Sequence, residues 1–149
     1  MNTKSFFLSW IFSSLVMFSL SYLWHGVFLN DIVRLSYPLG IFMTSSIVAY
    51  LILGFLLTKI FLLKFHKHIS ERPFLKGLIS GAILGMVSYL FTLAIGVSFS
   101  SSLTTKYILM DILWQIIEQS AGGITVAIVY VWIYDDDPAT ILTRKFFGD

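Results

Sequence analysis

The polar residues best suited to chemistry lie in the last long apolar segment of the chain. Asp111, Gln115 and Glu118 recur at positions i, i+4 and i+7, which places them on one face of a helix, and Gln119 follows directly. Residues 111–134 are otherwise apolar enough to cross a bilayer. Lipid cannot solvate an ionisable side chain, so Glu118 must face protein or water. We therefore expect other helices to enclose it.

The first apolar segment ends in polar residues that we expect at the same membrane boundary as Asp111. His25 closes that segment, and Asp31 follows in a short connection. Glu118 would lie about 10 Å below Asp111 at the helical rise of 1.5 Å per residue. The pattern predicts a hydrated pocket with Glu118 as its floor and His25, Asp31 and Asp111 around its mouth. Such a carboxylate could hold a proton, a cation or a polar head group.

Two structural interpretations of Glu118 compete with the pocket. The carboxylate could form one interhelical hydrogen bond, for example to a serine of the first helix, and only fix packing. It could also contact another subunit. Polar contacts between membrane helices contribute about 0.6 kcal/mol on average, so a structural hydrogen bond of Glu118 would need no functional explanation.

The remaining polar residues do not form a recognisable catalytic or metal site. His66 and His68 are two residues apart and lack a third ligand at metal spacing, so we expect a solvated or lipid-contacting loop. Asp135, Asp136 and Asp137 lack the glycine and the later acid of a calcium loop, and we expect helix capping. The chain has no cysteine, and no nucleophile elbow, phosphate loop or zinc protease motif is present. We expect no metal and no cofactor.

The amino-acid composition indicates the class of protein to which these residues belong. The chain has 149 residues, of which 57% are hydrophobic and 12% charged, and its mean hydropathy is +0.86. Soluble domains contain about 25% charged residues, so this chain lacks the polar surface of one. A net charge of +2 without a basic stripe gives no sign of nucleic-acid binding. We predict an all-α polytopic membrane protein.

Four apolar segments, each close to the length that spans a bilayer, predict a single membrane domain over residues 1–149. The first segment is longer than the apolar part of a signal peptide, so we interpret it as a transmembrane helix. Asp137 before Pro138 predicts the start of a short interfacial helix. The expected helices are a bundle of four, at about 6–25, 39–63, 74–99 and 109–134, followed by a tail helix at 138–147.

Glycines predict where these helices pack closely. Gly77, Gly81 and Gly85 are four residues apart and form a ridge on one face of the third helix. Gly122 and Gly123 lie in the fourth helix. Small residues let the backbones of membrane helices approach one another, so we expect these five to be packing residues.

Charged residues predict the orientation of the helices. With four crossings, eight of the ten lysines and arginines fall on one side, and only Arg34 and Lys106 fall on the other. Cytoplasmic loops are enriched in lysine and arginine. We therefore expect a multi-pass protein of the inner, cytoplasmic membrane with both termini in the cytoplasm, and His25, Asp31 and Asp111 at the outer face.

The order of these features resembles that of small bacterial four-helix inner-membrane proteins in families of unknown function. The residues that carry the resemblance are Leu23, Trp24, His25, Gly26 and Phe28 at the end of the first helix, Gly77 at the start of the third, and Asp111 at the start of the fourth. The resemblance implies a four-helix membrane bundle and no particular activity.

Three functions fit the sequence. The first is a non-enzymatic bundle, either an accessory subunit of a membrane complex or a self-associating protein, because catalytic motifs are missing and small residues are frequent. The second is a proton- or ion-coupled carrier in which Glu118 titrates. The third is a lipid- or quinone-binding membrane enzyme that uses His25 and Glu118. The expected partners are the lipid bilayer, other membrane subunits or a second copy, and a lipid or small hydrophobic ligand.

Overall fold

The computed structural model describes residues 3–29, 38–63, 72–97 and 105–134. Within these ranges every regular element is a helix. The elements are α1 (Thr3–Ser21), η1 (Tyr22–Phe28), α2 (Leu39–Leu62), α4 (Pro73–Val97) and α5 (Thr105–Tyr134).

Four helical segments are long and apolar enough to cross a membrane: Thr3–Phe28, Leu39–Leu62, Pro73–Ala94 and Ile108–Trp132. They pack as a bundle. The prediction of an all-helical protein with four such helices is therefore confirmed. The predicted interfacial helix at 138–147, Asp31, His66, His68 and the three aspartates at 135–137 lie outside the described residues.

Two helices extend beyond the bounds expected from hydropathy. α1 continues into η1, a π-helical segment in which the backbone N–H of Leu29 donates to the carbonyl of Trp24 over 2.8 Å. α5 begins at Thr105, so Asp111 lies in its second turn and does not open the helix. In both cases several of the additional residues are polar or aromatic, and a helix can include them because its backbone hydrogen bonds do not depend on hydropathy.

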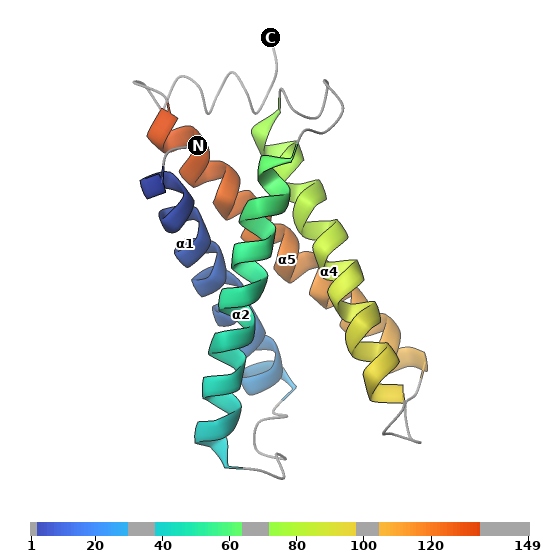
Figure 1. Ribbon diagram of the computed structural model, residues 1–149. Coiled ribbons are helices and arrows are strands. Elements are labelled where there is room, and N and C mark those ends of the chain that lie inside the picture. Colours follow the sequence, from blue (N-terminus) through green and yellow to red (C-terminus); the bar gives the residue numbers. More distant parts are fainter. Residues whose placement is uncertain (1–2, 30–37, 64–71, 98–104, 135–149) are drawn as a thin grey trace.

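The helices form two antiparallel pairs, α1 with α2 and α4 with α5 (Figure 1). α1 also packs along α5 and joins the two pairs, whereas α2 makes few contacts with α4 and α5. The end of the bundle that holds Lys4, Lys59 and Lys76 is called the Lys4 end below, and the opposite end, which holds His25 and Asp111, is called the His25 end. In Figure 1, α2 and α4 lie close together at the Lys4 end and diverge toward the His25 end.

Glycines bring α4 and α5 into direct backbone contact. A Cβ atom added at Gly77, Gly81 or Gly85 would collide with the backbone carbonyl oxygen of Gly123, Gln119 or Gln115, respectively. The three contacts advance by four residues along each helix in opposite directions, as antiparallel packing requires. Gly122, on a different face of α5, lies against the side chains of Met17 and Leu57.

The apolar core occupies the Lys4 half of the bundle. The buried residues of α2 are Gly54, Leu57, Thr58 and Phe61, all in its second half. Leu57 and Phe61 belong to a core cluster with Met17, Phe74, Leu84, Val126 and Ala127. The first half of α2 contributes no buried residue, which leaves room between the helix pairs at the His25 end.

Candidate functional site: a polar cavity between the helix pairs

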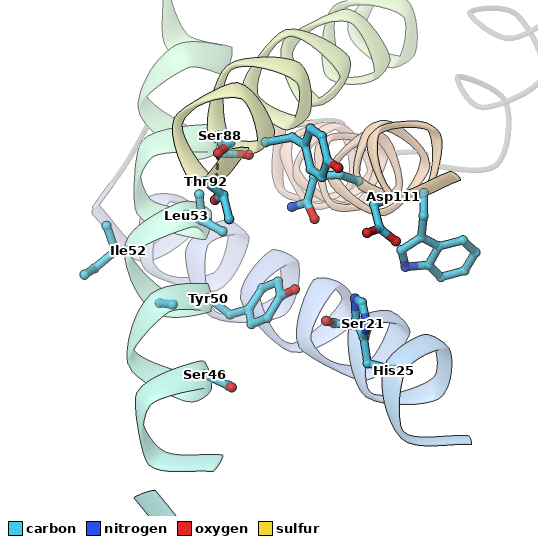
Figure 2. Close-up of a pocket in the computed structure, with 13 residues that line it drawn as sticks. Ser21, His25, Ser46, Tyr50, Ile52, Leu53, Ser88, Thr92 and Asp111 are labelled. Atoms are coloured by element: carbon cyan, nitrogen blue, oxygen red, sulfur yellow. Dashed lines mark hydrogen bonds between the residues drawn. The ribbon is translucent and has the colours of Figure 1, made fainter. Parts of the chain in front are cut away.

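A cavity of about 560 Å³ lies between the two helix pairs at the His25 end. All four long helices or their extensions contribute to its lining (Figure 2). The lining residues are Ser21, His25, Ser46, Ala49, Tyr50, Ile52, Leu53, Ser88, Tyr89, Thr92, Asp111, Trp114 and Gln115. Ligand pockets in proteins measure about 300–1,000 Å³, so the volume suits a small organic molecule or a lipid head group.

The π-helical segment η1 carries His25 to this cavity. One residue earlier, Trp24 stacks on Trp114 of α5 with ring centroids 4.3 Å apart and an interplanar angle of 11°. The stack ties η1 to α5 and so fixes the position from which His25 extends. Figure 2 shows His25 and Ser21 directed toward the same space as Asp111 of α5. π-helical turns often occur at functional sites because they change the direction of the side chains that follow.

The face of α5 identified from residue spacing does reach the cavity. Asp111 and Gln115 line it, together with Trp114. Opposite them, α2 provides Tyr50, whose ring points into the space between the helices (Figure 2). α4 closes the remaining side with Ser88, Tyr89 and Thr92. Thr92 donates to the carbonyl of Ser88, so its hydroxyl is held close to its own helix.

Glu118 lies behind the cavity wall and is fully buried, with 0% of its surface exposed. Its polar neighbours are the side chains of Tyr50, Trp114 and Ser21, all three of which line the cavity. All three lie close enough to interact with the carboxylate, although none of them meets strict hydrogen-bond geometry with its oxygens in the described part of the chain.

Gln119, the buried polar residue that follows Glu118 in the chain, lies in a different environment. It is 0% exposed and its Cβ faces Gly85 on α4. Neither polar atom of its side-chain amide has a hydrogen-bond partner among the described residues. Gln119 is therefore at the α4–α5 contact, and it is not part of the cavity lining.

The residues that sequence reasoning did not single out are mostly aromatic or hydroxyl-bearing. Tyr50 and Trp114 stand between Glu118 and the cavity, and Tyr89 lines the opposite wall. Trp114 could have been found, since it is three residues after Asp111 and four before Glu118. Tyr50 carried no such signal, because a single tyrosine in an apolar segment is ordinarily a packing residue.

The lining combines hydrogen-bonding groups with apolar surface. Hydroxyls, an amide, an imidazole and a carboxylate can orient the polar part of a ligand, while Ala49, Ile52 and Leu53 offer apolar contact. Within the described ranges no group of three or more histidine, cysteine or acidic side chains is placed to hold a metal ion. The lining can therefore contact both the polar and the apolar part of a molecule.

Comparison of the chain with protein-family models, with curated proteins and with solved structures finds no match.

Proposed function

We propose that this protein binds an amphipathic small molecule or lipid within the membrane, with the polar part of the ligand in the cavity at the His25 end. The observation that carries the proposal is the cavity of about 560 Å³ with a mixed polar and apolar lining from all four long helices. Its walls include α2 and α4, which make few contacts with each other. An apolar tail could therefore leave the cavity between these two helices and lie in lipid.

The small residues that suggested self-association are engaged within the chain. Gly77, Gly81 and Gly123 meet one another or Gln119 across the α4–α5 contact, and Gly122 meets Met17 and Leu57. These glycines already pack against other helices within one copy of the chain. They therefore do not favour an accessory or self-associating role over ligand binding.

A carrier coupled to Glu118 is also less well supported than binding. Transport needs access to the site from both ends of the bundle. The cavity lies at the His25 end, whereas Leu57, Phe61 and Val126 form a packed core toward the Lys4 end. Ligand binding requires access from one end only, which is what the described residues provide.

For orientation, we propose that the His25 end faces outward from the inner membrane. Lys4, Lys59 and Lys76 lie at the other end, and the positive-inside rule assigns such an end to the cytoplasm. The ligand would then be taken from the outer leaflet.

The test is to extract the protein with its surrounding lipid in polymer nanodiscs and to identify bound molecules by native mass spectrometry. Ser46→Trp should fill the cavity from α2 and remove the bound molecule, because Ser46 lines the cavity. Ser19→Trp is the matched control, since Ser19 is an exposed serine of α1 that does not line it. A wild-type protein without a bound molecule, or identical adducts in both variants, would contradict the proposal.

A further inference from the structure

Among the described residues, the lining of the cavity holds an acidic side chain and no lysine or arginine. Its ionisable lining residues are His25 from η1, Tyr50 from α2, Tyr89 from α4 and Asp111 from α5. None of the thirteen residues drawn around it is a lysine or an arginine. Asp111 is the acidic residue of this lining.

A second carboxylate lies directly behind this lining. Glu118 is 0% exposed, and both of its oxygens lack a hydrogen-bond partner among the described residues. Its polar neighbours Tyr50, Trp114 and Ser21 form part of the cavity wall. Burying a carboxylate is costly unless a cation or hydrogen-bond donors compensate it. A cation in the cavity would add to the partial compensation that these three neighbours provide.

We infer that the cavity selects an organic cation, whose positive charge lies between Asp111 and Glu118 and against the rings of Tyr50, Tyr89 and Trp114. This inference rests on the proposed function, because it specifies the charge of the ligand that the cavity holds. Aromatic faces attract cations within about 6 Å of the ring centroid, most strongly when the cation is desolvated. Three aromatic residues, one each from α2, α4 and α5, line the cavity and can provide such faces.

The same features favour an organic cation over a metal ion or an anion as the ligand. A bare metal ion requires several clustered oxygen or nitrogen ligands, and no such cluster occurs among the described residues. A phosphate or sulfate ligand needs lysine or arginine in the lining. Lys59 and Lys76 lie at the Lys4 end, where their ammonium groups stand 5.2 Å from the ring centroid of Phe6 and 5.1 Å from that of Phe61. Lys106, at the start of α5, is exposed and does not line the cavity.

Tetraphenylphosphonium and tetraphenylborate test the charge preference, because they have nearly the same shape and opposite charge. Triphenylphosphine oxide is a neutral third probe. Binding to the full-length protein in dodecyl maltoside is measured by titration calorimetry, with empty micelles as the blank. We expect the phosphonium to bind at least about ten-fold more tightly than either other probe, and Ser46→Trp to abolish its binding.

Substitution of the carboxylates connects this preference to the two residues. Asp111→Asn and Glu118→Gln should each weaken phosphonium binding about ten-fold, whereas Asp111→Glu, which keeps the charge, should restore most of it. Lower pH should also weaken binding, because protonation of Asp111 or Glu118 removes negative charge. Tyr50 and Tyr89 remain neutral as the pH falls, so they do not contribute to this change.

The outcomes separate the inference from the proposed function. If a neutral or anionic probe binds as tightly as the phosphonium and Ser46→Trp blocks it, the charge preference is wrong and ligand binding stands. If Asp111→Asn and Glu118→Gln both bind the phosphonium like the wild type, the assignment to these carboxylates is wrong. If none of the three probes shows binding that Ser46→Trp removes, both proposals fail.

Discussion

Trp24 and Trp114 stack face to face although they belong to opposite helix pairs, with ring centroids 4.3 Å apart and planes 11° from parallel. Trp24 immediately precedes His25, and Trp114 immediately precedes Gln115. One aromatic contact therefore connects two neighbouring polar residues of the cavity lining. Its position where α1 changes into η1 makes it the contact that joins the π-helical segment to the rest of the bundle.

Disrupting this stack should weaken the bundle in a way specific to the pair. An aromatic pair contributes about 0.5–1.5 kcal/mol beyond the area it buries, so a double-mutant cycle of Trp24→Leu and Trp114→Leu should give a coupling energy in that range. The measurement is unfolding by sodium dodecyl sulfate in mixed micelles, followed by circular dichroism. Trp132, which is 69% exposed, provides the control. Trp24→Leu and Trp132→Leu should be additive, and an equally additive Trp24/Trp114 pair would contradict the prediction.

Adding one methyl group at the α4–α5 contact should destabilise the protein. A Cβ atom at Gly81 would collide with the backbone of Gln119, which a rotamer change cannot relieve. Overpacking of this kind costs about 1–3 kcal/mol, so Gly81→Ala should lower the unfolding midpoint. Gly40→Ala is the matched control, because nothing lies within 4 Å of a Cβ atom there. Similar midpoints for the two variants, measured by scanning fluorimetry in detergent, would show that the helices do not approach so closely.

Replacing the buried carboxylate by an apolar side chain of similar size should stabilise the protein. Glu118 has two buried oxygens without a hydrogen-bond partner among the described residues, and an unsatisfied buried polar group costs about 1–3 kcal/mol. Glu118→Leu should therefore raise the free energy of unfolding by roughly this amount. Ile117→Leu, at a position that is 56% exposed, should leave it unchanged. A loss of stability in Glu118→Leu would instead favour the interpretation of Glu118 as a satisfied structural contact.

The proposed orientation can be tested by single cysteines, since the natural chain has none. Thr3 and Thr105 are both exposed and lie at opposite ends of the bundle. We expect a membrane-impermeant maleimide to label Thr105→Cys in intact cells and to label Thr3→Cys only after the membrane is opened. The reverse pattern would place the cavity on the cytoplasmic side and would remove the outer leaflet as the source of the ligand.

Hydropathy predicted the helices well because a membrane span is a local property of about 20 consecutive residues. It predicted their ends less well. η1 continues the first helix as far as Phe28, and α5 starts at Thr105. Backbone hydrogen bonds can extend a helix beyond the apolar residues that hydropathy identifies. The spacing of Asp111, Gln115 and Glu118 likewise indicated a common direction, since a helix repeats every 3.6 residues.

The neighbours of Glu118 were only partly within reach of such reasoning. A serine of the first helix was expected near Glu118, and Ser21 at the end of α1 is such a neighbour, but nothing in its own segment indicated that Tyr50 of α2 would be another. In a membrane protein the lipid-facing residues are as apolar as the buried ones, so no hydrophobic stripe marks the inner face of each helix.

By itself, therefore, the sequence determined that the chain contains four apolar helices and that one of them carries an acid away from its ends. Only the tertiary structure decided that the core lies in the Lys4 half, that a cavity lies in the His25 half, and that Tyr50 and Trp114 separate this cavity from Glu118. The physical reason is that hydropathy acts on each segment separately, whereas helix rotation and splay are set by contacts between segments, such as glycine against backbone and tryptophan against tryptophan.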